Sequence, residues 1–199
     1  MVSGPSGSGK TSLVEAVLME VSNLTFSVSH TTRKPRLREI HGKDYFFINE
    51  AKFKKMISDG CFLEHAQVYG HYYGTTKEFV ISELASGHDV ILDVDVQGAA
   101  QVSRYKLDSL LIFVVPPSLR ELRSRLERRG LDNDSVIIQR LSIAHKEIQC
   151  YKHYHCVIIN NKIRESVSEL KLIIMADCYR VKRRNKQVEQ IIQTFKEDF

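Results

Sequence analysis

Short apolar runs alternate with stretches of helical periodicity along most of the chain. The apolar runs that predict buried strands are Val2-Ser3, Thr25–Ser29, His88–Val94, Ser109–Val115 and His155–Ile159. Helical spacing is found in the stretches between and after them, notably around Leu13 and Val17 and over Glu78–Ser86 and Arg164–Arg180. Strands that alternate with helices predict an α/β fold in which helices flank a parallel sheet.

The stretch from about residue 30 to residue 85 departs from this alternation. Short strands and one amphipathic helix are predicted there, at Asp44–Ile48, Glu50–Ser58, Phe62–Val68 and Tyr72–Thr75. A tight turn is expected at Gly70-His71, and the charged segment Thr31–Gly42 has no apolar period, which predicts a functional loop or a solvated linker. We interpret residues 30–85 as a small mixed α/β insert.

A second departure follows the strand that ends at Val115. Ser118 is a favourable N-cap for a helix that reaches about Glu127. The segment Arg120–Arg140 is dense in arginine and interrupted by Gly130, which predicts a mobile flap. The chain then divides into a core (1–29, 86–117 and 150–199), the insert and a lid at about 118–149. The tail from Val181 is basic and then amphipathic, which favours a solvated helix over a segment that binds a partner or nucleic acid.

Composition limits the class of protein. The chain has 199 residues, 43% of them hydrophobic and 27% charged, which predicts one soluble domain. No apolar run approaches the ~20 residues that span a bilayer, and no secretion signal opens the chain, so we expect a cytoplasmic protein with reduced cysteines. The cluster from Cys150 to Cys156 matches no zinc-binding spacing. The net charge of +5 suits nucleic acid and phosphorylated small molecules equally well.

The clearest chemical motif follows the first strand and matches the Walker A pattern of a P-loop. Its residues are Gly4, Pro5, Ser6, Gly7, Ser8, Gly9, Lys10, Thr11 and Ser12. The glycines let backbone N–H groups surround phosphate oxygens, Lys10 reaches the β- and γ-phosphates, and the Thr11 hydroxyl is a ligand for Mg²⁺. This loop predicts ATP binding. The strand before it, Val2-Ser3, is unusually short, since a loop of this kind normally follows a strand of about five buried residues.

Charged residues elsewhere indicate transfer of a phosphoryl group. Such a reaction needs cations around the phosphate and a pocket for the acceptor. The candidate cations outside the loop are Arg33, Arg36, Arg125, Arg129 and Arg140. Asp93 and Asp95 end an apolar strand, where open α/β sheets place their ligands, so one of them can hold magnesium through water.

The chain resembles the guanylate kinase family, P-loop enzymes that phosphorylate GMP with ATP. The matching blocks span nearly the whole sequence in family order: GPSGSGKTSL (4–13), SVSHTTRKPR (27–36), Glu39 with GKDYFF (42–47), FLEHAQVYGHYYGTT (62–76), ILDVDVQGA (91–99), PPS (116–118), RLERRG (125–130), RLSIAHKE (140–147) and VIIN (157–160).

This resemblance implies a role for each matching residue. Ser29, Glu64, Thr75 and Asp95 would hydrogen-bond guanine, and Arg33, Arg36, Tyr45 and Tyr73 would hold the GMP phosphate. Lys10, Arg129, Arg140 and Arg125 would surround the transferring phosphate, with Arg33 also counted among the catalytic cations, and Asn160 would lie near adenine. Glu64 and Asp95 suit the N1–H and amino donors of guanine, whereas adenine would leave both carboxylates unpaired.

The implied reaction needs Mg²⁺ and no general base, because an oxygen of the GMP phosphate is already an anion. The expected partners are GMP, or dGMP in its place, and ATP, without nucleic acid or membrane, in a monomer or homodimer. The insert and the lid would close to exclude water and so prevent hydrolysis.

Three residues differ from the family pattern. His30 replaces a small hydroxyl residue, Arg38 stands where glycine is common, and His41 replaces an acid or amide. They flank the phosphate-binding arginines without removing them, so they bear on affinity and loop shape.

Two alternatives remain. A related kinase could use another phosphorylated acceptor such as ribose 1,5-bisphosphate, although a sugar phosphate has no N1–H and amino pair for Glu64 and Asp95. Guanylate-kinase-like scaffold modules bind partners without catalysis, but they typically lack the intact loop that Gly4, Gly9 and Lys10 provide here.

Overall fold

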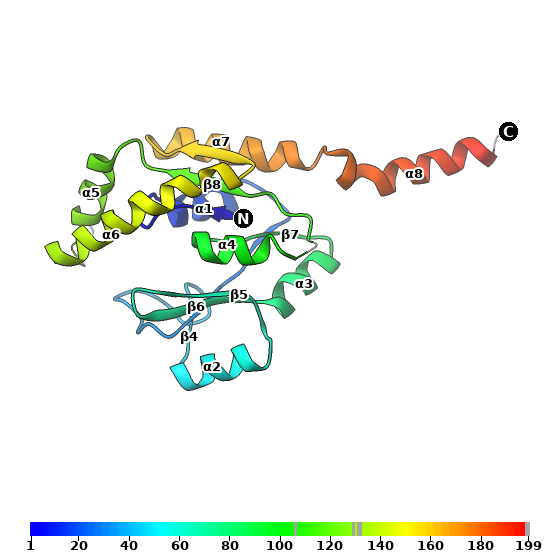
Figure 1. Cartoon of the computed structure of the whole chain (residues 1–199). Coiled ribbons are helices and arrows are strands. Elements are labelled where there is room, and N and C mark those ends of the chain that lie inside the picture. The colour runs from blue at the N-terminus through cyan, green and yellow to red at the C-terminus, as the bar shows by residue number, and fades with distance from the viewer. Residues whose placement is uncertain (106, 129, 131–132, 198–199) are drawn as a thin grey trace.

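The computed structural model describes residues 1–105, 107–128, 130 and 133–197. It confirms an α/β fold whose parallel strands are flanked by helices (Figure 1). Within the described residues the strands are β1 (Val2–Ser3), β2 (Leu24–Phe26), β3 (His30–Thr31), β4 (Phe46–Phe47), β5 (Phe62–Val68), β6 (His71–Thr76), β7 (Asp89–Ile91), β8 (Ile112–Val115) and β9 (Cys156–Ile159). The α-helices are α1 (Lys10–Leu18), α2 (Glu50–Ser58), α3 (Lys77–Ala85), α4 (Val96–Val102), α5 (Leu119–Arg128), α6 (Asp134–Glu147), α7 (Ile163–Asp177) and α8 (Val181–Glu197), and a 3₁₀ helix covers Ile148–His153.

The parallel sheet is built around the short first strand. β1 pairs with β8, β8 pairs with β9, and β2 pairs with β7, all in parallel. The two groups are joined by backbone hydrogen bonds, from the Val2 N–H to the Leu92 carbonyl (2.8 Å) and from the Val94 N–H to the Val2 carbonyl (3.1 Å). The strand order is therefore β2-β7-β1-β8-β9, with β1 in the middle. Its central place puts the loop that follows it at the carboxyl edge of the sheet.

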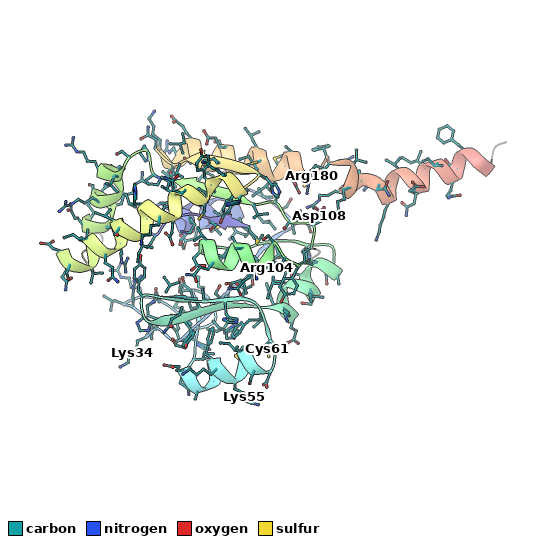
Figure 2. The ribbon with its side chains drawn as sticks, in the orientation of Figure 1. Lys34, Lys55, Cys61, Arg104, Asp108 and Arg180 are labelled. Carbon is teal, nitrogen blue, oxygen red and sulfur yellow. The ribbon has the colours of Figure 1, made fainter. Side chains whose placement is uncertain are left out.

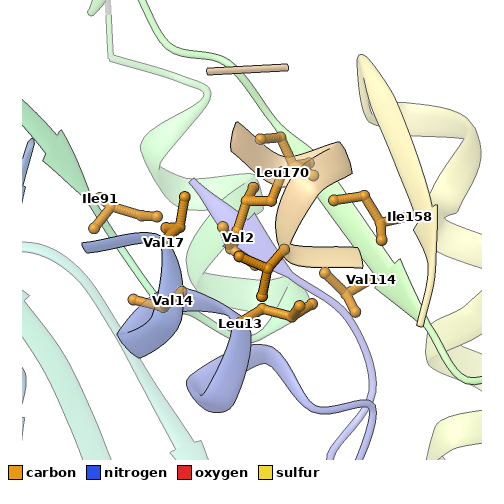
Figure 3. Packing of buried hydrophobic residues seen from close by; sticks show 10 residues of the cluster. Val2, Leu13, Val14, Val17, Ile91, Val114, Ile158 and Leu170 are labelled. Carbon is orange, nitrogen blue, oxygen red and sulfur yellow. The ribbon is translucent and has the colours of Figure 1, made fainter. Parts of the chain in front are cut away.

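Apolar layers cover both faces of this sheet. On one face, side chains of α1 and α7 pack on the strands around Val2, Leu13, Ile91 and Leu170, all of them buried (Figure 3). On the other face, Leu92 and Val94 pack against α3 and α4. Ile91 and Leu92 point to opposite faces because side chains alternate along a strand. This double burial explains the continuous apolar run of that strand.

A second, antiparallel-rich sheet lies below the parallel one in Figure 1. Its strand order is β4-β3-β6-β5, and α2 packs against it through the fully buried Phe53, whose ring stacks on Phe62 at 4.5 Å. Lys34 and Lys55, labelled in Figure 2, lie in the lower part of the view, with the second sheet and α2. The turn between β5 and β6 is at Tyr69-Gly70, one residue earlier than the sequence predicts.

The last helix, α8, extends away from the rest of the chain (Figure 1). Ion pairs hold its start: Arg183 with Asp89 (2.5 Å) and Arg180 with Asp108 (3.2 Å), the latter pair labelled in Figure 2. Val188, Ile191 and Phe195 along this helix are exposed. A search of the described helices finds none with the length and apolar character that a membrane span needs.

Candidate active site

The glycine-rich loop takes the path that its sequence predicts. Gly4, Gly7 and Gly9 all have positive φ, at 137°, 89° and 95°. A Cβ atom on Gly4 would fall on the carbonyl oxygen of Val114, and one on Gly9 would fall on the side-chain amide of Asn160. Only glycine combines these backbone angles with so close an approach. The loop therefore lies directly against β8 and the segment after β9.

Lys10 and Thr11 begin the helix that follows the loop. The Lys10 ammonium donates to the carbonyls of Gly4 (2.7 Å) and Pro5 (3.2 Å), so it lies inside the curve of the loop. The Thr11 hydroxyl donates to a carboxylate oxygen of Asp93 (2.8 Å). Helix α1 has Gly9 as its N-cap and no side-chain capping bond, so its first N–H groups point toward the same loop.

Two residues predicted from distant parts of the chain meet behind the loop. The Asn160 side-chain amide donates to the Ser8 carbonyl (2.8 Å). Arg125 donates to the same carbonyl (3.2 Å) and to the Asn160 carbonyl (2.8 Å), while its Nε binds Glu121 (2.9 Å). Arg125 therefore braces the loop through backbone carbonyls and brings a positive charge to its edge.

Of the other two cations predicted in the lid, only Arg140 is among the described residues. Arg140 lies on α6, is 9% exposed, and has its guanidinium 4.8 Å from the centre of the Tyr69 ring. Arg129 lies outside the described residues.

Two carboxylates predicted to bind a base lie close together at the start of α4. Asp95 is the N-cap of this helix and accepts from the Gly98 N–H (2.7 Å). Glu64 comes from β5 and approaches Gly98 so closely that a Cβ there would fall on its Oε2. Its other oxygen accepts from the Thr75 hydroxyl (2.6 Å), which lies 3.4 Å from the Ser29 hydroxyl. The four residues predicted to contact guanine thus form one connected group.

Burial changes the acidity of both carboxyls. Desolvation raises the pKa of Glu64 to about 7, and the nearby Asp95 charge adds to this rise, while hydrogen bonds from Thr75 oppose it. Burial also raises the pKa of Asp95, against the effect of the Gly98 N–H and the Lys10 charge. Two neighbouring acids with raised pKa values form a candidate functional site.

The residues predicted to hold a phosphate also come together. Arg33 forms a two-point ion pair with Glu39, at 2.9 and 2.8 Å, and its guanidinium lies 5.5 Å from the centre of the Tyr45 ring. The rings of Tyr45 and Tyr73 contact each other at 5.9 Å. Burial raises the pKa of Tyr45 to about 12, with a further rise from the charge of Asp93. Arg36 is exposed, and its backbone N–H donates to Glu39 (2.7 Å).

Several residues of this region carry no predicted role. Glu39 belongs to the family-like blocks, but nothing in its spacing indicates that it pairs with Arg33. Gln101 of α4 makes two hydrogen bonds to the backbone of His65, next to Glu64. Glu147, at the end of α6, lies near Lys10 and the Ser6 N–H; burial raises its pKa, and these two groups lower it. None of these contacts follows a helical or strand period, so they leave no periodic signal in the sequence.

The oxygen ligands available at the loop fit a hard cation. The Thr11 hydroxyl and the Asp93 carboxylate are in contact at the position where a P-loop holds Mg²⁺. Among the described residues no group of three or more His, Cys, Asp or Glu side chains gathers as a metal site. Few protein ligands are the rule for Mg²⁺, which keeps waters and phosphate oxygens in its coordination shell.

Comparison with known proteins gives a consistent result. The family model described as Guanylate kinase matches residues 1–177. The guanylate kinase of Escherichia coli is 44% identical over 194 residues, which cover 96% of this chain and 94% of that protein. The guanylate kinase of Caldanaerobacter subterraneus is 43% identical over 183 residues, covering 92% and 89%. The crystal structure of guanylate kinase from Anaplasma phagocytophilum matches with a TM-score of 0.77 and 32% identity, over 92% of this chain and 86% of that one.

Proposed function

The chain belongs to the guanylate kinase family, and from that premise we propose that it transfers the γ-phosphate of ATP to GMP, producing ADP and GDP. The observation that carries this proposal is the pair of carboxylates, buried Glu64 and half-buried Asp95, which meet at Gly98, with the charge of the P-loop Lys10 acting on Asp95. The sugar of GMP is not part of that recognition, so dGMP is proposed as a second acceptor.

Recognition of guanine follows from the chemistry of the carboxylates. Guanine presents two donors side by side, its N1–H and its 2-amino group, and Glu64 and Asp95 are acceptors when ionised. Thr75 donates its hydroxyl proton to Glu64 and so can accept from the base, and Ser29 extends the group with a second hydroxyl. Adenine has an acceptor at N1 and no 2-amino group, so AMP would leave buried carboxylates unpaired. We assign base selection to these four residues.

The acceptor phosphate is assigned to Arg33, Arg36, Tyr45 and Tyr73. Glu39 occupies the Nη1–Nη2 edge of the Arg33 guanidinium and holds it in one orientation, so the Nε–Nη2 edge is the one assigned to two phosphate oxygens. The tyrosines donate O–H bonds without adding charge. Tyr45 remains protonated at physiological pH, because its pKa is raised to about 12.

The donor is assigned to the loop, with Gly4 to Ser12 around the phosphates of ATP and Asn160 near its adenine. The residues present fit Mg²⁺, with Thr11 as a ligand and Asp93 acting through water; when bound, the ion would neutralise charge on the β- and γ-phosphates. Lys10 would move from the carbonyls of Gly4 and Pro5 to the phosphate oxygens, since a charged acceptor is the stronger partner.

Transfer itself needs positioning and positive charge. An oxygen of the GMP phosphate attacks the γ-phosphorus, and the bond from that phosphorus to the bridging oxygen of ADP breaks. No proton has to be removed from the nucleophile, so no general base is assigned. We assign charge stabilisation to Lys10, Arg33, Arg125, Arg129 and Arg140, of which Arg129 lies outside the described residues. Residues 30–85 and 118–149 are proposed to close over the substrates as insert and lid, in a monomer or a homodimer.

Comparison of acceptors in one assay tests the proposal. ADP release from ATP is followed by coupled oxidation of NADH, with GMP, dGMP, AMP, UMP and ribose 1,5-bisphosphate as acceptors. We expect turnover with GMP and dGMP and rates lower by about 10⁴-fold or more with AMP, the discrimination expected of a site built to hydrogen-bond its substrate. Equal rates with AMP and GMP would refute the assignment of guanine, and turnover with the sugar phosphate alone would favour the other kinase. Lys10→Ala should bind GMP and lose most turnover.

A further inference from the structure

The turn between β5 and β6 has an unusual residue in its first position. Val68 pairs with His71, so the loop consists of Tyr69 and Gly70 alone. Both have positive φ, at 50° and 80°, as a type I′ turn requires. Asn, Asp or Gly is the usual choice at the first position, because a bulky side chain rarely adopts a positive φ. Tyr69 therefore occupies a backbone conformation that is unfavourable for a tyrosine.

The tyrosine ring contacts a buried arginine from another part of the fold. The Arg140 guanidinium lies 4.8 Å from the ring centre, within the range of a cation–π contact. Arg140 belongs to α6, near the parallel sheet, whereas Tyr69 belongs to the hairpin of the second sheet. Because Arg140 is only 9% exposed, the contact is largely removed from water, where such contacts are strongest.

We propose that Tyr69 is a positioning residue, whose ring holds the Arg140 guanidinium in the orientation needed for phosphoryl transfer. This inference rests on the proposed function, in which Arg140 stabilises the transferring phosphate. An aromatic face orients a guanidinium without neutralising its charge.

The position of Tyr69 also links the two substrates. The hairpin that carries Tyr69 carries Glu64, Tyr73 and Thr75, which are assigned to GMP. Movement of this hairpin on GMP binding would move the ring, and with it the guanidinium assigned to the phosphate of ATP. A cation on the donor side would thus be in place when the acceptor is bound, which limits transfer to water.

Two substitutions at position 69 separate the ring from the turn. Tyr69→Phe keeps the ring and removes only the hydroxyl. Tyr69→Asn removes the ring and places a favoured residue of type I′ turns, so the hairpin should remain folded. For GMP phosphorylation we expect kcat of Tyr69→Phe within about twofold of the unmodified chain, and kcat of Tyr69→Asn lower by about tenfold, with both KM values little changed. About tenfold is the effect of losing a partly desolvated cation–π contact.

A double-mutant cycle identifies the partner. In an Arg140→Met background, adding Tyr69→Asn should cause no further loss of kcat, since the guanidinium that the ring positions is gone. The same cycle measured by thermal unfolding reports the contact itself, independently of turnover. Unchanged kcat in Tyr69→Asn, or equal losses with and without Arg140, would overturn the proposal. If the unmodified chain fails to phosphorylate GMP, the proposed function is refuted. The thermal-unfolding cycle still measures whether the Tyr69 ring and the Arg140 guanidinium are coupled. Zero coupling energy in that cycle overturns the positioning role of Tyr69.

Discussion

The Glu39 carboxylate holds the Arg33 guanidinium through two parallel hydrogen bonds, 2.8 and 2.9 Å long, with both side chains largely withdrawn from solvent. Burial alone would raise the pKa of Glu39, but the bonds from Arg33 and the Arg36 N–H outweigh it and leave the pKa lowered. Together with the neighbouring rings of Tyr45 and Phe47, this ion pair fixes the direction of the Arg33 guanidinium, which is assigned to the GMP phosphate.

Glu39→Gln should raise KM for GMP by about three- to tenfold and leave KM for ATP unchanged. The substitution removes the two-point grip, so the arginine must be ordered on binding, at about 0.5–1.5 kcal/mol. Steady-state kinetics with each substrate varied in turn measures both constants. Glu50→Gln, which breaks the exposed pair with Lys54, is the matched control and should change neither. A lower KM for GMP would show that Glu39 competes with the phosphate, contrary to this role.

Binding of GMP should depend on pH near neutrality. Burial raises the pKa of Glu64 from 4.5 to about 7, so the carboxyl is protonated below pH 7 and then offers fewer acceptors to guanine. We expect KM for GMP to rise as the pH falls through about 7, and binding to release protons there. Calorimetry in buffers of different ionisation enthalpy counts these protons. The Glu64→Gln variant should lose the proton release, and an unchanged release would assign it to another group.

The same carboxyl should make the free protein less stable as the pH rises from about 4.5 to 7. In that range the folded state keeps a proton on Glu64 that the unfolded chain has lost. Because the folded state binds more protons, the free energy of unfolding falls as the pH rises, by up to about 3 kcal/mol in all. Urea denaturation at several pH values measures the slope, and Glu64→Gln should flatten it. A slope of the same size in that variant would contradict the assignment.

Gly98→Ala should impair GMP binding without unfolding the protein. Alanine favours the helix by about 1 kcal/mol over glycine, but its Cβ would fall on the Glu64 carboxylate, which Thr75 already holds. We expect KM for GMP to rise by at least about tenfold with the melting temperature kept or raised. Ala100→Gly, at an exposed position of α4, should do the reverse, lowering stability and sparing KM. Normal KM in Gly98→Ala would mean that Glu64 adapts freely.

Gln101→Leu should destabilise the protein by about 1–3 kcal/mol. The Gln101 amide bonds both the N–H (3.1 Å) and the carbonyl (2.6 Å) of His65, and leucine leaves both half-buried groups without that partner. Gln101→Glu keeps the acceptor and loses the donor, so its loss should be intermediate if the charge is tolerated. Gln97→Leu, exposed on the same helix, should stay within about 0.5 kcal/mol. Equal stability of all three variants in urea denaturation would contradict this account.

Strong periodicity in the sequence predicted elements well. The predicted bounds of α2 and β5 agree with the structure residue for residue, and the Ser118 hydroxyl does accept from the Glu121 N–H (3.1 Å) at the start of α5. Strands β7 and β8 are shorter than the runs that predict them, at Asp89–Ile91 within His88–Val94 and Ile112–Val115 within Ser109–Val115, whereas β1 matches its run. Apolar residues continue beyond the last ladder bond because both faces of the sheet stay covered there.

Helix α4 was not predicted, and the β5–β6 turn lies one residue earlier than the sequence predicts, in both cases for physical reasons. The segment Val96–Val102 is short and contains a glycine, which weakens helical periodicity, and its start is secured by Asp95 instead. The turn begins at Tyr69, whose positive φ is uncommon for a tyrosine and is not indicated by the sequence. In the site, motifs located the loop and the carboxylates, whereas the partners Glu39, Gln101 and Tyr69 depend on contacts that only the folded chain creates.

The hydrogen bond from Asn160 to Ser8 joins positions separated by 152 residues. The nucleotide loop is therefore finished by a residue that the ribosome adds only after most of the parallel sheet has been synthesised. Since contacts of such sequence separation form late and slow folding, a nascent chain shorter than 160 residues would expose this loop without its brace. The loop assigned to ATP thus receives this brace only when the last strand of the parallel sheet, β9, has been made.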